Sequence, residues 1–362
     1  MIIPLEYFNE NLGHRGETIS NLISVDKLEM GMILGNDVIE KNTGVVLIAK
    51  DMGMTKAVIE RLSKYGIDKV SIKEEEIPAE KYNNSLMDKY MDVEKNLDLI
   101  FTEIKNGKRL ESQRLVEEMK DFVEEIINER DILTQMRLLK KRDDYTFNHS
   151  LGVSTLGASM GKWLNYSQEE IRDLSIAGLF HDIGKLKIPD EIINKPGDLT
   201  EEEFEIVKKH STYSGDILEE TGEFNNDIIL GVLQHHEKMD GTGYPDGIKG
   251  DKIHRYGKII GICDIYHAIT SRRVYRDREN PLKVADYIRS EGFTKLDPHM
   301  TAVFLKNISK CYVGNKVILN TGEIGEIVYI YPQDDTKPIV KVGDGFVDIL
   351  KEKDVEVVDI II

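Results

Sequence analysis

Seven of the nine histidines in this 362-residue chain fall between residues 149 and 267, and this crowding is the strongest constraint on its fold. Most of them sit in segments whose apolar residues recur at the spacing of an amphipathic helix. A buried polar group without a partner costs about 1–3 kcal/mol, so a core cannot bury many imidazoles uncompensated. The pattern predicts a helical bundle whose interior is a polar site.

Two of the predicted helices begin at capping boxes, in which Ser167 and Thr200 each precede a glutamate by three residues. In the first helix, His181 lies on the same face as the apolar stripe. The second helix is predicted to run unbroken past residue 210, with Phe204 and His210 on its inward face. Both helices therefore direct a histidine toward the core.

The segment "DIILGVLQHHE" places His235 beside His236 at the end of a third predicted helix. Adjacent helical residues point about 100° apart, so the two rings are expected to serve one metal ion each. In "KIIGICDIYHAIT", Asp264 and His267 share one helix face, three residues apart. His149 adds an imidazole from a further segment that reads as helical.

Five helical segments that each direct a histidine or an aspartate inward predict a metal centre. The candidate ligands are His149, His181, Asp182, His210, His235, His236 and Asp264. Imidazole and carboxylate ligands without thiolate suit Fe, Mn, Zn or Ni. This set exceeds what one ion uses, so the sequence predicts two ions, which Asp182 or Asp264 could bridge.

Composition limits the partners and the location of the chain. The net charge of −17 disfavours binding to nucleic acid or to an anionic membrane surface. No apolar run approaches the ~18 residues that a membrane span needs, so no membrane insertion is expected. Cys263 and Cys311 are the only cysteines and lie far apart in sequence, so no disulfide framework is implied and a cytoplasmic location is expected.

Patterns along the chain predict four parts. These are a small α/β regulatory or interaction unit (1–84), a helical connector (85–140), the histidine-rich helical domain (141–308) and a small β unit (309–362). In the first unit, Thr55 is expected to cap a short helix. In the connector, Met119, Phe122 and Ile126 form an apolar stripe. This stripe would either pack on the neighbouring domain or pair two chains into a homodimer through the 110–140 helix.

Three strings in the helical domain resemble a known family. "HDIGK" (181–185), "HHEKMDGTGYP" (235–245) and "ICDIYHAITSRRVYR" (262–276) are similar to the HD-GYP subgroup of the HD metal-dependent phosphohydrolases. The resemblance implies a mainly α protein with an all-helical catalytic domain. It also implies two divalent ions, Fe or Mn, held by the seven candidate ligands. The implied activity is hydrolysis of cyclic di-GMP to pGpG and GMP by a metal-bridging hydroxide that attacks a phosphodiester.

The resemblance also implies roles for individual residues. Asp182 and Lys185 would be catalytic, and Lys185 would contact a scissile phosphate oxygen. Tyr244, Arg273 and Arg276 would hold the nucleotide and its other phosphate. An aromatic ring and two guanidinium groups suit a ligand with purines and two anionic phosphates.

Four positions depart from the family pattern: Tyr145, His267, and Arg272 and Val274, which replace a commoner Asp and Pro. Family members with a third metal tend to have a glutamate four residues before the first histidine ligand, where this chain has Tyr145. Two ions are therefore expected rather than three. His267 stands where many members have an aspartate, and its imidazole could be an outer-shell partner, an extra ligand or a proton donor.

Two other functions remain open at this stage. One is a non-catalytic receptor for a cyclic dinucleotide, although a degenerate receptor should have lost some of the ligands that are present here. The other is a phosphohydrolase acting on another nucleotide or on another cyclic dinucleotide, such as cyclic GMP-AMP. The Gly-Tyr-Pro loop around Tyr244 argues against an ordinary nucleotide substrate.

Overall fold

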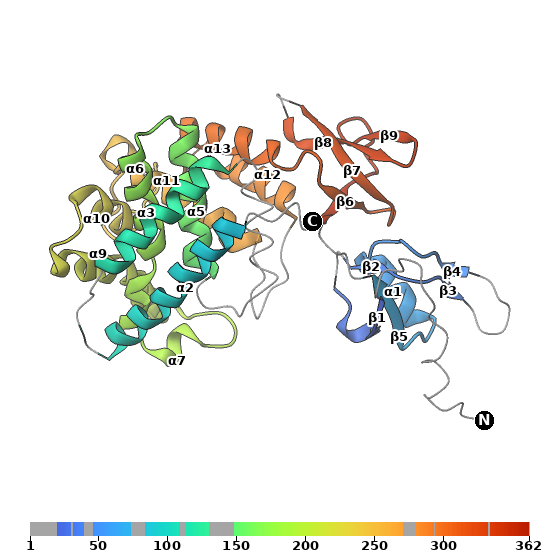
Figure 1. Cartoon of the computed structure of the whole chain (residues 1–362), viewed down its shortest axis with the longest axis horizontal. Coiled ribbons are helices and arrows are strands. Elements are labelled where there is room, and N and C mark those ends of the chain that lie inside the picture. The colour runs from blue at the N-terminus through green and yellow to red at the C-terminus, as the bar shows by residue number, and fades with distance from the viewer. Residues whose placement is uncertain are drawn as a thin grey trace. The chain divides into compact units, whose positions relative to one another are not determined.

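The computed structural model describes residues 20–29, 32–39, 46–73, 84–106, 108, 113–129, 148–270, 280–292, 294–331 and 334–361. The chain divides into two compact units, Met1–Pro78 with Ile318–Ile324, and Ala79–Val317 with Gly325–Ile362. The predicted mainly α fold with a small N-terminal α/β unit and a small C-terminal β unit is confirmed (Figure 1). The finer division at residues 84, 140 and 308 stays a prediction. Within the described ranges, no helix has both the length and the apolar character needed to cross a membrane.

In its described residues, the N-terminal unit combines short strands with one α-helix and the 3-10 helix η2 (Val25–Lys27). Its elements are β1 (Ser20–Ser24), β2 (Ile33–Leu34), β3 (Val38–Ile39), β4 (Val46–Ile48), helix α1 (Lys56–Lys64) and β5 (Lys69–Lys73). One sheet has the order β1-β5-β2, and β3 pairs with β4. As predicted, Thr55 caps α1, because its side chain accepts a hydrogen bond from the Val58 N–H. Leu34, Met54 and Leu62 are fully buried in the core of this unit.

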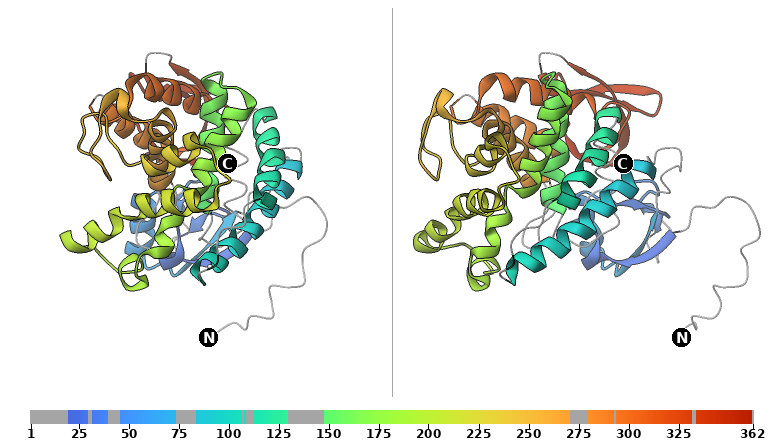
Figure 2. Two further views of the ribbon diagram at one scale, coloured as in Figure 1. Left: turned by 90° about the vertical axis from the view of Figure 1, so that its left-hand side faces the viewer. Right: turned by 60° about the vertical axis from the view of Figure 1, so that its left-hand side comes forward.

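The connector forms a helical hairpin that packs within the chain. It consists of α2 (Asn84–Lys105) and α3 (Gln113–Asn128), which contact each other. The predicted stripe of Met119, Phe122 and Ile126 is buried, and α3 packs against α5 (Asn148–Trp163), beside which it lies in both views of Figure 2. This confirms packing on the neighbouring helices. A homodimer through the 110–140 helix stays a prediction, but this stripe is buried within the chain and does not form its interface.

The close pair α5 and α6 (Gln168–Phe180) forms the centre of the helical domain (Figure 1). The predicted capping box at Ser167 opens α6, and the short connection makes the two helices antiparallel. Ser154 and Ser175 share a 2.8 Å hydrogen bond between their buried hydroxyls across the interface. As a result, the start of α5, with His149, lies beside the end of α6, with His181.

The remaining helices complete the bundle around this pair. They are η4 (Ile183–Lys187), α7 (Asp190–Ile193), α8 (Glu201–Lys208), α9 (His210–Thr221), α10 (Asn226–Leu233), η5 (Gly250–Lys252), α11 (Arg255–Thr270), α12 (Pro281–Gly292) and α13 (Pro298–Lys310). The capping box at Thr200 is confirmed. The unbroken helix past residue 210 is wrong, because α8 ends at Lys208 and α9 begins at His210. Phe204 is correspondingly 45% exposed rather than inward.

A β-sheet follows the last helix. Its strands are β6 (Lys316–Leu319), β7 (Ile324–Tyr331), β8 (Asp334–Val342), β9 (Gly345–Asp348) and β10 (Val357–Ile361), in the order β10-β6-β7-β8-β9. β8 pairs antiparallel with both β7 and β9. Contacts of β8 and β10 with α12, and of β8 with α13, join the sheet to the helical domain.

Substitutions at two glycines test the close packing of α5 on α6. A Cβ at Gly178 would lie 2.9 Å from the Cα of Ser154, which is backbone and cannot yield cheaply, whereas a Cβ at Gly157 would meet nothing closer than 3.4 Å. We expect Gly178→Ala to lower the free energy of unfolding by about 1–3 kcal/mol. Gly157→Ala should leave it unchanged or raise it by about 0.5–1 kcal/mol, because alanine favours the helix. Urea unfolding measures both, and equal effects would contradict this packing.

Candidate metal centre

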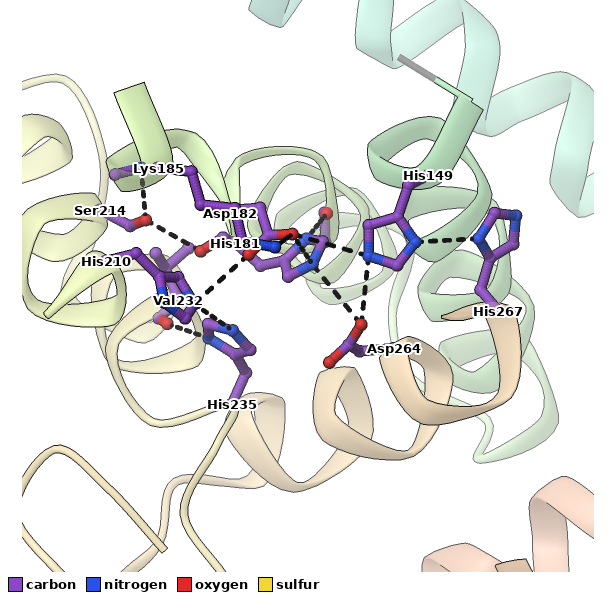
Figure 3. A network of polar contacts seen from close by, with 12 residues as sticks. His149, His181, Asp182, Lys185, His210, Ser214, Val232, His235, Asp264 and His267 are labelled. Atoms are coloured by element: carbon purple, nitrogen blue, oxygen red, sulfur yellow. Dashed lines mark hydrogen bonds and ion pairs between the residues drawn. The ribbon is translucent and has the colours of Figure 1, made fainter. Parts of the chain in front are cut away.

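The seven predicted ligands come together in the helical domain, and Figure 3 labels all of them except His236. Two clusters of side chains could each hold a metal ion, with all ligand atoms of a cluster within 4.8 Å of one another. They are His149, His181 and Asp182, and His210, His235 and His236. Asp264 joins the first, since its Oδ1 lies 3.1 Å from His149 Nε2 and 3.9 Å from His181 Nε2. His235 and His236 thus share one cluster, whereas the sequence suggested one ion for each.

Asp182 lies between the two clusters. Its Oδ2 is 3.3 Å from the Nε2 of His181 and 3.6 Å from that of His149. Its Oδ1 is 3.3 Å from the Nε2 of His210, in the other cluster. One carboxylate therefore presents an oxygen to each cluster, which is the geometry of a bridging ligand.

Three of the imidazoles are oriented by the same hydrogen bond. The Nδ1 atoms of His181, His210 and His235 lie 2.8, 2.7 and 2.5 Å from the backbone carbonyls three residues earlier, those of Gly178, Val207 and Val232. A carbonyl oxygen only accepts hydrogen bonds, so each Nδ1 must carry the proton. Each Nε2 then keeps a lone pair directed at the centre. Metal-binding histidines are commonly fixed in this way.

The acceptors of these bonds are available because three helices end there. The last four carbonyls of a helix lack intrahelical partners. His181 is the C-cap of α6, His210 follows the end of α8, and His235 lies two residues beyond the end of α10. The same breaks explain the errors in the predicted helices. His235 and His236 have left α10, so the 100° rule does not apply, and their ring centroids lie 4.0 Å apart.

The histidines of the second cluster are uncharged at neutral pH. Burial lowers the pKa of His210, lowers that of His235 well below the ordinary value, and lowers that of His236 to about 3. Neutral imidazole is the form that binds metals. His181 differs, because burial would lower its pKa but the charges of Asp182 and Asp264 raise it. The negative field at His181 that favours a proton also favours a metal cation.

Both carboxylates are ionised. Burial would raise the pKa of Asp182, but the Lys185 ammonium and the neighbouring imidazoles hold it well below its usual value. Burial would likewise raise the pKa of Asp264, yet the hydrogen bond and charge of His149 hold it well below that value. The site therefore combines anionic oxygens with imidazole nitrogens, a suitable donor set for Fe, Mn or Zn.

Two buried atoms at the centre lack hydrogen-bond partners among the described residues. They are His181 Nε2 and Asp182 Oδ1. A buried polar atom without a partner costs about 1–3 kcal/mol, and such atoms are rare in folded proteins. A metal ion bonded to each of these atoms would satisfy both. The residues present therefore fit a metal centre.

The Gly-Tyr-Pro loop borders the second cluster. The partly exposed ring of Tyr244 lies 4.6 Å from the His236 ring, tilted by 32°, and 6.2 Å from the His210 ring. A Cβ at Gly243 would come within 2.4 Å of the His236 carbonyl oxygen, so the loop needs glycine there. Burial raises the pKa of Tyr244, which keeps its hydroxyl protonated.

Lys185 approaches the centre from the solvent side. Its Nζ lies 2.5 Å from Asp182 Oδ2, and its side chain is 41% exposed. The predicted substrate residues Arg273 and Arg276 lie outside the described residues, as does Tyr145. Their predicted roles stay predictions.

Ser214 and Glu237 support the site but were missed in the sequence. Ser214 Oγ donates to the His181 carbonyl and accepts from the Gly184 N–H, which ties η4 to α9. The buried Glu237 carboxylate accepts from the Asp246 N–H, 2.8 Å away, inside the Gly-Tyr-Pro loop. A serine four residues after His210 and a glutamate beside the His-His pair were the available signals.

Comparison with known proteins adds three findings. The profile of the HD domain family matches residues 124–300. The chain is 31% identical over 245 residues, 67% of its own length and 58% of the relative's, to "Cyclic di-GMP phosphodiesterase PA4108" of Pseudomonas aeruginosa. It is 34% identical over 197 residues, 54% of its length and 45% of the relative's, to "3'3'-cGAMP-specific phosphodiesterase 1" of Vibrio cholerae. The chain thus spans about half the length of these curated relatives.

A solved structure supports the fold. "Bd1817, a HDG"Y"P protein from Bdellovibrio bacteriovorus" aligns with a TM-score of 0.50 at 15% identity, over 79% of this chain and 98% of that one. At this identity the likeness concerns the fold alone.

The depressed pKa of His236 predicts a loss of stability in acid. The unfolded chain takes up this proton near the ordinary value of 6.5, whereas the folded protein does so only at about 3. Between these values the unfolded state binds more protons, so stability falls as pH falls below 6.5. For metal-free protein, we expect this histidine to contribute about 1.4 kcal/mol of the loss between pH 7.5 and pH 5.5.

Urea unfolding after chelation, compared at the two pH values, measures this loss. His236→Gln should lose about 1.4 kcal/mol less than the unsubstituted protein. His299→Gln, which replaces an exposed histidine on α13, is the matched control and should keep the full loss. The same loss in all three proteins would show that His236 is not buried in its neutral form.

Proposed function

Because the chain belongs to the HD domain family, we propose that it is a cytoplasmic metal-dependent phosphodiesterase that hydrolyses cyclic di-GMP to pGpG and GMP. The observation that carries the proposal is Asp182, whose two oxygens face two separate clusters of imidazoles. A pair of divalent ions is a common solution for hydrolysing phosphodiesters. The names of similar proteins support a cyclic dinucleotide as the substrate class.

We assign the predicted ligands to two ions, with Fe or Mn as the expected metals. One ion would be held by His149, His181 and Asp264, the other by His210, His235 and His236, with Asp182 bridging. When bound, such a pair of ions supplies a hydroxide nucleophile at neutral pH and neutralises charge on the phosphoryl oxygens.

The chain's own residues would then bind and orient the substrate. Lys185 is partly exposed and reaches the bridging carboxylate. Its ammonium can therefore stabilise negative charge that develops on a phosphate oxygen next to Asp182. Tyr244 offers a partly exposed aromatic surface beside the second cluster, on which a guanine base could stack. Arg273 and Arg276 are proposed to bind the second phosphate.

A second candidate substrate is cyclic GMP-AMP. The similarity to a protein named as specific for 3'3'-cGAMP is the observation that favours it. This ligand has the same two phosphates and differs in one purine, so the metal centre and Lys185 would serve both. A receptor without catalysis is less consistent with the site, because all seven candidate ligands are present and grouped.

The proposal predicts turnover that depends on the ligand set. Protein purified without oxygen and loaded with Fe(II) or Mn(II) should release pGpG or GMP from cyclic di-GMP. Chromatography measures these products. His235→Ala should lower the rate by more than the 10–100-fold typical of losing an outer-shell partner. The exposed His299→Ala should keep the full rate.

Parallel reactions with cyclic GMP-AMP and with a panel of nucleotides separate the candidate substrates. Faster turnover of cyclic GMP-AMP would make cyclic GMP-AMP the substrate and leave the proposed mechanism unchanged. Tight binding of cyclic di-GMP without turnover under either metal would instead make the protein a receptor.

Lys185 can be tested against its neighbour on the same short helix. We expect Lys185→Met to lower kcat by about 100-fold with both ions still bound, because removing one preorganised charge typically costs 10²–10³. Lys187→Met removes the same charge two residues away, where Lys187 is exposed and lies over the Tyr213 ring. This control should retain kcat within a few fold. Equal losses in the two variants would contradict a specific role for Lys185.

A further inference from the structure

We propose that His267 is a positioning residue that orients His149 toward the metal centre from outside it. The inference rests on the proposed function, because it takes His149 as a ligand. His267 lies on α11, one turn after Asp264, and is 1% exposed. Its Nδ1 is 3.0 Å from the Nδ1 of His149.

The His149 ring lies between His267 and the metal-site carboxylates (Figure 3). On the side away from His267, its Nε2 faces Asp264 at 3.1 Å and Asp182 at 3.6 Å. Two nitrogens at 3.0 Å share one proton. If His149 Nε2 keeps a lone pair for a metal, its Nδ1 carries the proton and donates to the Nδ1 of His267. His267 therefore acts as the acceptor.

The position of His149 in its helix explains why another side chain is needed. His181, His210 and His235 use free carbonyls at helix C-termini. His149 is the second residue of α5, and a helix N-terminus offers free N–H donors rather than carbonyls. Among the described residues, His267 on α11 supplies the acceptor for the Nδ1–H of His149.

Gly152 makes room for this imidazole. A Cβ at Gly152 would lie 2.0 Å from His267 Nε2 and 2.3 Å from its Cδ2, a distance that no real side chain allows. Glycine inside a helix costs about 0.5–1 kcal/mol relative to alanine, so its presence one turn after His149 fits a specific need. The same contact places Nε2 of His267 against α5, while Nδ1 is engaged by His149. Neither nitrogen faces Asp182, which makes His267 an outer partner and not an eighth ligand.

Two isosteric substitutions test the position of the acceptor. In His267→Asn, the amide oxygen can take the place of Nδ1 and accept from His149. In His267→Gln, the amide extends toward the place of Nε2 and leaves His149 without that acceptor. We expect His267→Gln to weaken one of the two bound Co(II) ions by 10–100-fold, and His267→Asn to keep both affinities within a few fold.

Titration with Co(II), followed by visible absorption and calorimetry, reads out each ion without any substrate. The thermal midpoint of the chelated protein checks the fold of each variant. Gly152→Ala is an independent test. It should displace His267 and weaken binding of the same Co(II) ion while leaving all ligands in place. If His267→Asn and His267→Gln bind Co(II) equally, whether both are weakened or neither is, the inference is wrong.

Failure of this inference differs from failure of the proposed function. An unsubstituted protein that binds fewer than two Co(II) ions would overturn the two-ion centre itself. An unsubstituted protein that binds two ions, with no difference between His267→Asn and His267→Gln, would overturn only the role of His267.

Discussion

The hydrogen bond from an imidazole Nδ1–H to a free carbonyl at a helix end is the interaction on which this structure depends. It occurs at His181, His210 and His235, and in each case leaves Nε2 directed at the interior. Within a helix, only the last four carbonyls lack intrahelical partners, and the helices end where these acceptors are used. At His149, in the first turn of α5, the acceptor is instead a side chain of α11.

Close packing brings these helix ends within reach of one bridging carboxylate. Gly178 lets α6 approach the backbone of α5, and Gly184 lies so near α9 that a Cβ would come within 2.1 Å of the His210 carbonyl oxygen. Asp182, between these two contacts, is held ionised by Lys185 and the imidazoles around it. A buried, ionised carboxylate among imidazoles favours a cation, so packing and electrostatics lead to the same chemistry.

The sequence predicted the helical domain, the capping boxes and all seven clustered side chains, because inward-facing histidines at helical spacing are a strong pattern. It did not predict the helix breaks before His210 and His235, since helical spacing continues through both points and only tertiary hydrogen bonds favour the break. It left the role of His267 open, because that role depends on its distance to His149 and on the space at Gly152. Local patterns carry no information on such contacts between distant residues.

Anomalous X-ray scattering from crystals grown with Mn(II) tests whether Asp182 bridges two metal ions. We expect two manganese peaks, one at His149, His181 and Asp264 and one at His210, His235 and His236, with one oxygen of Asp182 bound to each. A single peak, or two peaks that Asp182 does not bridge, would contradict the two-ion centre from which the proposed chemistry follows.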